Sequence, residues 1–76
     1  MQKRSLTIAG HRTSLALEPE FWDGLEAMAA ASDLPLPQLI QQIDETRSSG
    51  NLSSEVRLAV LHWYRQQAEA AKATAV

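Results

Sequence analysis

The sequence predicts a mainly α-helical domain with one short β-strand, followed by three helices, that pairs with a second copy of itself. Residues 12–17 alternate between polar and apolar, which is typical of a half-buried strand. Three later stretches carry apolar residues at helical spacing. The chain has 76 residues and no cysteine, so its core is small and no disulfide stabilises it. A second copy is therefore the expected source of further buried surface.

The predicted strand has two different faces, because successive side chains of a strand point in opposite directions. The residues expected to face the core are Thr13, Leu15 and Leu17, and those on the other face are Arg12, Ser14 and Ala16. A strand of six residues is not stable alone. Its partner is either residues 5–9, through a turn at residues 9–11, or the same strand of a second copy across a two-fold axis. Residues 1–11 are accordingly a basic N-terminal arm or an extra strand.

Three helices are expected after the strand. The first runs from Pro19 to about Ala31, the second from Pro37 to about Arg47, and the third begins near Ser53 as its N-cap. Residues 12–67 form the expected domain, and residues 68–76 are an alanine-rich tail expected to fray. Ten side chains are expected in the core of the dimer. They are the strand residues Thr13, Leu15 and Leu17 and the helix residues Phe21, Leu25, Leu39, Ile43, Val56, Val60 and Trp63.

Charge is distributed unevenly along the chain. Residues 1–12 contain three basic residues and no acid, whereas residues 13–46 contain seven acids and no lysine or arginine. The net charge of −2 argues against a protein that coats nucleic acid in bulk. The basic first dozen residues still permit a localised contact with phosphate.

The sequence offers no enzymatic or metal-binding constellation. The three glycines are scattered, and the two histidines have no acidic partner at metal-ligand spacing. We therefore expect no catalytic residue, no metal and no cofactor. No apolar run approaches 18 residues, so no membrane span is expected, and the absence of cysteine fits a reducing cytoplasm.

Two segments resemble a known family. Residues 11–22 read HRTSLALEPEFW and residues 51–57 read NLSSEVR. Both are similar to a bacterial subgroup of the ribbon-helix-helix proteins, the family of Arc- and MetJ-type repressors, and the resemblance covers about residues 4–65. It implies an intertwined homodimer whose two-stranded antiparallel ribbon enters the major groove of double-stranded DNA. The third helix lies beyond the minimal fold and would enlarge the dimer or join dimers into a larger assembly.

The resemblance also implies roles for individual residues. Arg12, Ser14 and Ala16 would face the bases, and an arginine can bind guanine O6 and N7 with two hydrogen bonds. The charge of the N-terminal arm, apart from the resemblance, predicts that Lys3 and Arg4 contact phosphates. The function expected is a cytoplasmic transcriptional regulator. The alternative is a protein-interaction or antitoxin-like oligomeric adaptor that does not bind DNA itself, which the acidic total charge favours; a purely structural oligomer is a third reading.

Overall fold

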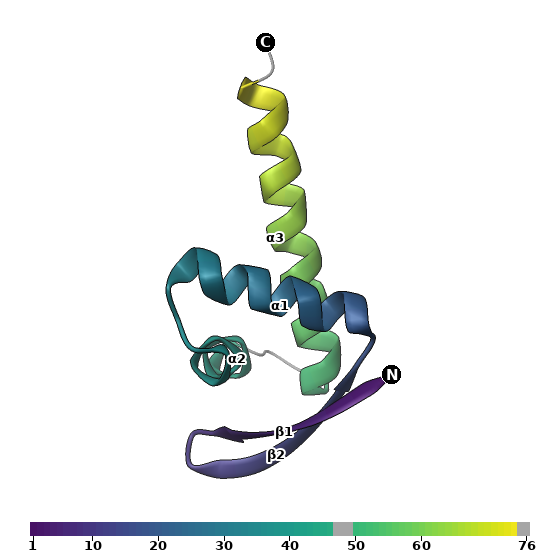
Figure 1. Ribbon diagram of the computed structural model, residues 1–76, viewed down its shortest axis with the longest axis vertical. Helices are drawn as coiled ribbons and strands as arrows, with labels where there is room; N and C mark the ends of the chain where they lie inside the picture. Colours follow the sequence, from purple (N-terminus) through teal and green to yellow (C-terminus); the bar gives the residue numbers. More distant parts are fainter. Residues whose placement is uncertain (47–49, 75–76) are drawn as a thin grey trace.

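The chain folds into a β-hairpin covered on one face by helices, with a long third helix that projects away from the hairpin (Figure 1). The computed structural model describes residues 1–46 and 50–74. The elements in chain order are β1 (Gln2–Ile8), β2 (His11–Leu17), α1 (Pro19–Ser32), α2 (Leu36–Glu45) and α3 (Leu52–Thr74). The molecule measures 46 × 24 × 23 Å, and its long dimension follows α3.

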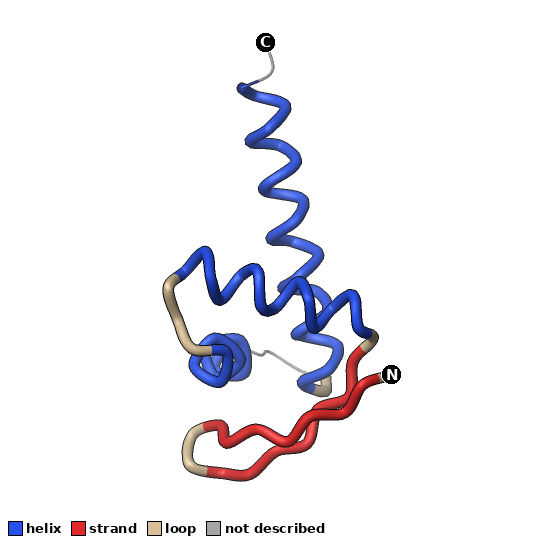
Figure 2. The backbone as a smooth tube through the Cα atoms, in the orientation of Figure 1, coloured by secondary structure: helices blue, strands red, loops and turns tan. Residues whose placement is uncertain are grey.

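The structure has two strands where the sequence predicted one. β1 pairs antiparallel with β2 in a register that sets Gln2 opposite Leu17 and Ile8 opposite His11 (Figure 2). Ala9 and Gly10 join the strands with φ values of 52° and 81°, as a two-residue type I′ turn requires. The partner of β2 is thus the chain's own N-terminal segment, and the ribbon forms within one chain. No other strand among the described residues pairs with the second edge of β2.

The boundaries of α1 and α2 follow from local chemistry. Pro19 lies in the first turn of α1, where its missing N–H costs nothing. The helix ends at Asp33, which adopts the left-handed conformation with φ 54° and ψ 43°. Pro35 then precedes α2 in an extended conformation. Helix α2 ends at Glu45, and the expected continuation to Arg47 falls outside the described residues.

Helix α3 differs from the prediction at both ends. The backbone N–H of Ser54 donates to the side-chain oxygen of Asn51 over 2.8 Å, so Asn51 is the N-cap and not Ser53. The helix continues to Thr74, through the stretch expected to fray, because alanine has the highest helix propensity. Residues 75–76 of the expected tail lie outside the described residues.

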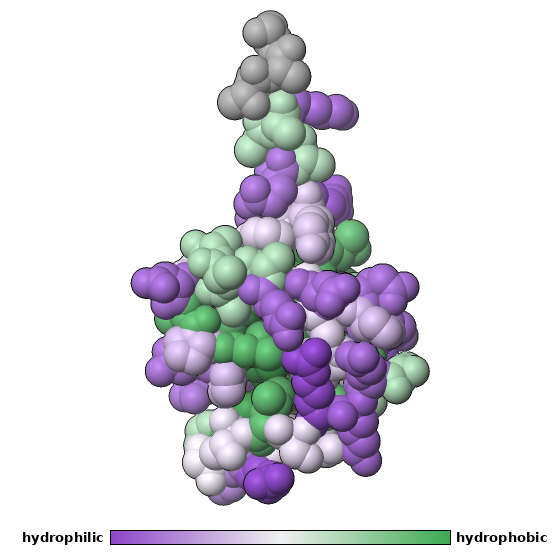
Figure 3. Space-filling view, viewed as in Figure 1, coloured by the Kyte–Doolittle hydropathy of each residue, from purple (hydrophilic) through white to green (hydrophobic). Residues whose placement is uncertain are grey.

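The core is built from all five elements of a single chain. Trp22 is its largest fully buried side chain. Of the ten residues expected in the core of a dimer, seven are buried within this one chain, namely Leu15, Leu17, Leu25, Leu39, Ile43, Val56 and Val60. Thr13, Phe21 and Trp63 remain partly exposed. On the face shown in Figure 3, strongly hydrophobic residues gather between α1 and the hairpin, so apolar surface remains uncovered there.

Candidate nucleic-acid interface

The hairpin presents one face to solvent, because the helices pack against the other. We call this exposed face the outer face. Its residues, taken from the alternation of each strand and from the pairing register, are Lys3, Ser5, Thr7, Arg12, Ser14 and Ala16. All are exposed except Ala16, which is half-buried. The outer face therefore carries two cations and three hydroxyls, and it has no carboxylate although the chain is acidic overall.

The pairing register orders the outer face along the hairpin. Arg12 lies opposite Thr7 near the turn, and Lys3 lies opposite Ala16 at the open end. Ser5 and Ser14 face each other between them. At about 3.3 Å per residue, the two cations are separated by roughly 13 Å along the strands. A central pair of hydroxyls flanked by two cations can donate and accept hydrogen bonds at base edges while the cations contact phosphate or guanine.

Arg4 does not share this face, although the sequence grouped it with Lys3. Its guanidinium carbon lies 4.5 Å from the centroid of the Trp22 ring. Its Nη1 donates to the Glu26 carboxylate over 3.0 Å. Successive side chains of a strand point to opposite faces, so Arg4 points toward the helices and its neighbour Lys3 points to solvent. The structure thus brings Lys3, Arg12, Ser14 and Ala16 to one face and separates Arg4 from them.

Trp22 holds the open end of the hairpin against α1. Its indole Nε1 donates to the carbonyl oxygen of Gln2 over 2.9 Å. The ring also lies beneath Arg4, so one side chain fixes β1 through two contacts. The sequence did not predict this role of Trp22 or the positions of Ser5 and Thr7 on the outer face. The alternation of residues 3–7 was the signal that would have found the two hydroxyls.

The segments that carried the family resemblance meet at an ion pair. Arg57 of α3 binds both carboxylate oxygens of Glu18, with Nε to Oε1 at 2.9 Å and Nη2 to Oε2 at 3.3 Å. These hydrogen bonds hold the pKa of the Glu18 carboxyl below its ordinary value. The guanidinium carbon also lies 5.9 Å from the Phe21 ring centroid. The end of β2 is thereby tied to the first turns of α3.

The N-terminus of α2 offers little to an anion. Pro35 and Pro37 have no N–H group. The N–H groups of Gln38 and Leu39 both donate to the Pro35 carbonyl oxygen, over 3.0 and 3.2 Å. Only the N–H of Leu36 remains available in this first turn. A phosphate would therefore find one backbone donor here where an ordinary helix start presents several.

The part of the chain that the structure describes offers neither a metal-binding cluster nor a membrane-spanning helix. No group of three or more His, Cys, Asp or Glu residues within residues 1–46 and 50–74 could hold a metal ion. No helix over the same residues is long and apolar enough to cross a membrane.

Comparison with known proteins identifies the family. The sequence profile described as "Ribbon-helix-helix domain" matches residues 1–64. The chain belongs to the ribbon-helix-helix family. The match covers the hairpin, α1, α2 and the first half of α3. Domains of this family are typical of DNA-binding regulators and are typically not enzymes.

A solved structure supports the same fold for this ribbon-helix-helix chain. An uncharacterized protein from Bordetella pertussis Tohama I aligns with a TM-score of 0.76 and 35% sequence identity. The alignment covers 91% of this chain and 59% of that protein, so this chain spans well under two thirds of its length. No curated protein matches the chain.

Proposed function

We propose that this ribbon-helix-helix protein is a sequence-specific DNA-binding transcriptional regulator that reads the major groove with the outer face of its hairpin. The observation that carries the proposal is the composition of that face. An acidic chain gathers Lys3, Arg12 and three hydroxyls there and leaves every carboxylate elsewhere. A localised positive surface on an acidic protein favours a specific phosphate and base contact over non-specific coating.

The acting species in this proposal is a dimer paired through β2. The edge of β2 that does not face β1 would join the same edge of a second copy, giving four strands in the order β1-β2-β2-β1. Three strand spacings of about 4.8 Å set the outer strands about 14 Å apart. The major groove is about 12 Å wide. The central β2 pair would therefore enter the groove, and the two β1 strands would lie over the phosphates.

We propose a different contact for each residue type. Arg12 of both copies would bind guanine O6 and N7, and Ser14 would hydrogen-bond an adjacent base. Ala16 would contact a thymine methyl group. Lys3 on the flanking strand would neutralise a phosphate. The single free N–H at the start of α2 makes phosphate anchoring there weak, so the strand cations carry most of the affinity.

The test is a fluorescence-anisotropy titration against duplexes selected from genomic DNA, at several salt concentrations. Arg12→Ala is expected to weaken binding by roughly 10- to 100-fold and to relax preference at one base position. Lys3→Ala is expected to weaken binding to all DNA sequences alike. It is also expected to reduce the slope of log affinity against log salt concentration by about one. Arg65→Ala is the matched control, because it removes one cation from an exposed position on α3.

Two results would contradict the proposal. Equal losses of DNA affinity from Arg12→Ala and Arg65→Ala would show that binding depends on the net charge of the protein and not on the outer face. Absence of binding to any genomic duplex at low salt would favour the adaptor function, which the acidic total charge supports.

A further inference from the structure

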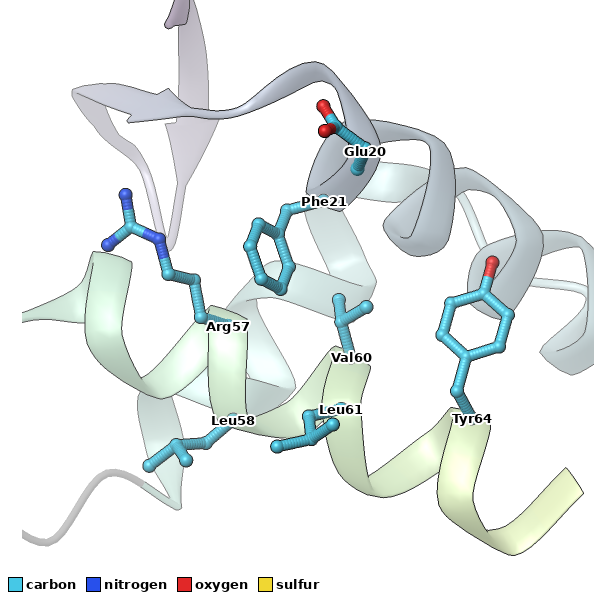
Figure 4. Close-up of a pocket in the computed structure, with 7 residues that line it drawn as sticks. All are labelled: Glu20, Phe21, Arg57, Leu58, Val60, Leu61 and Tyr64. Atoms are coloured by element: carbon cyan, nitrogen blue, oxygen red, sulfur yellow. The ribbon is translucent and has the colours of Figure 1, made fainter. Parts of the chain in front are cut away.

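An apolar groove runs along α3 on the helical side of the molecule. Its volume is about 300 Å³. The residues that line it are Glu20, Phe21, Arg57, Leu58, Val60, Leu61 and Tyr64 (Figure 4). Leu58, Leu61 and Tyr64 are 47%, 49% and 47% exposed, whereas the core side chains are under 10%. We call this surface the α3 groove; it lies on the opposite side of the hairpin from the outer face.

The apolar stripe continues beyond the groove as small residues. Tyr64 is followed by Ala68 and Ala71, so together with Leu61 these residues recur at alternating steps of three and four. That spacing keeps them on one side of a helix and is the seam of a two-helix pair. Every residue from Tyr64 to Lys72 is exposed. This half of α3 projects past the rest of the chain, which therefore leaves its stripe uncovered (Figure 1).

We infer that the α3 groove binds the projecting half of α3 from a second copy, antiparallel, about a two-fold axis. The order of side-chain sizes decides the direction. Antiparallel packing sets Leu61 against Ala68 and Leu58 against Ala71, so each leucine meets an alanine, and the two Tyr64 side chains meet at the two-fold axis. Parallel packing would set leucine against leucine near the domain and alanine against alanine at the tip, which leaves the tip unfilled. Matched large and small positions let helices approach to the usual 8–10 Å.

Charge complementarity identifies the occupant as this chain's own helix. In the antiparallel register Lys72 of one copy lies opposite Arg57 of the other. The Arg57 guanidinium is already bound to Glu18, so Glu20 on the rim of the groove is the acid that would pair with Lys72. Neither the Glu20 nor the Lys72 side chain forms an ion pair within the described residues. Because the contact is two-fold symmetric, each interface contains this acid–base pair twice. The surface is separate from the strand edge used in the proposed dimer, so it joins two such dimers.

The first experiment measures the mass of the full chain by sedimentation equilibrium over a concentration series. Leu61→Glu is expected to halve the number of chains in the largest species while leaving the circular-dichroism spectrum unchanged. Leu61 is half-exposed, so a charge there does not enter the core. His62→Glu, at an exposed position beside the stripe, is the control and is expected to keep the mass of the unaltered chain. Equal masses for Leu61→Glu and His62→Glu would overturn the inference.

The second experiment tests the direction and the occupant. Glu20→Lys and Lys72→Glu are each expected to weaken association by roughly five- to tenfold, and the double exchange is expected to restore it. The chain has no cysteine, so a mixture of Leu61→Cys and Ala68→Cys proteins reports neighbours without interference. Disulfides are expected between the two variants, and links of Leu61→Cys chiefly to itself would refute the antiparallel register.

The inference and the proposed function fail separately. Leu61→Glu is expected to change mass and leave the affinity of each dimer for a single DNA site unchanged. Arg12→Ala is expected to change that affinity and leave the mass unchanged.

Discussion

Gly24 of α1 packs closely against α3, and its replacement by alanine tests how the two helices pack. A Cβ atom added there would lie 2.6 Å from Val60 Cγ1 and 3.1 Å from Tyr64 Cε2. The Tyr64 ring is half-exposed and can move aside. Val60 is 3% exposed and β-branched, so its χ1 is held and its methyl group cannot retreat.

Two effects of Gly24→Ala oppose each other. Helix propensity alone favours alanine by about 1 kcal/mol. Forcing a methyl group into a packed contact costs about 1–3 kcal/mol. The 2.6 Å contact with a buried, rigid side chain places the cost toward the upper end. We expect a net loss of about 1–2 kcal/mol in the free energy of unfolding, with a fall in Tm of about 4–8 °C for each kcal/mol.

The assay is urea denaturation of a double-mutant cycle. Val60→Ala removes the methyl groups that the new Cβ would meet, so Gly24→Ala is expected to be neutral or stabilising in that background. A single Gly24→Ala variant more stable than the unaltered protein would refute the packing described here, since propensity alone would then account for the result.

Three further predictions concern the contacts that hold the hairpin and α3. Trp22→Phe removes the donor to the Gln2 carbonyl and leaves a gap in the core, so we expect a loss of about 2 kcal/mol and faster amide exchange in β1; unchanged exchange would contradict this anchor. Because Arg57 lowers the pKa of the Glu18 carboxyl, the ion pair stabilises the fold at pH values above the ordinary carboxyl pKa. This stabilisation is lost as the pH falls through the lowered pKa that Glu18 has in the folded protein. The difference in Tm between the unaltered protein and Glu18→Gln is therefore expected to be largest near neutral pH and to close in acid. Asn51→Ala removes the α3 N-cap and is expected to cost about 1 kcal/mol by urea denaturation, whereas Ser53→Ala should cost less.

The helices were predictable from the sequence because prolines and apolar spacing mark them clearly. Pro19 and the residues from 33 to 37 fixed the start of α1 and the break before α2 to within one or two residues. The start of α3 was less certain, because Asn51 and Ser53 are both good caps. Only the 2.8 Å bond from Ser54 shows that Asn51 holds that position.

The hairpin was harder to predict because alternation does not identify a strand's partner. Residues 5–9 and a second copy were both possible partners for β2 in the sequence, and the second copy was favoured because it would cover the apolar surface of the helices. The turn decides between them, and Ala9 gives no warning that it adopts φ 52°, a conformation more typical of glycine or asparagine.

The candidate site was predictable on β2 and not on β1. The direction of Arg12 and Ser14 follows from the alternation of a strand that was recognised. Arg4 was grouped with Lys3 by charge alone, because β1 had no assigned faces. Its stacking on Trp22 and its pair with Glu26 depend on how α1 crosses the hairpin, which no local pattern encodes.

The opposite directions of Lys3 and Arg4 separate the face proposed to bind DNA from the contacts that hold the hairpin against α1. A substitution on the exposed side of the hairpin changes the set of groups offered to a ligand and disturbs no packed neighbour. Arg4, by contrast, contacts Trp22 and Glu26, so its replacement removes two contacts between β1 and α1. Under the proposed function, target preference is therefore free to diversify during evolution on a scaffold that stays the same. An insertion or deletion of one residue in β1 would instead turn Lys3 inward and Arg4 outward.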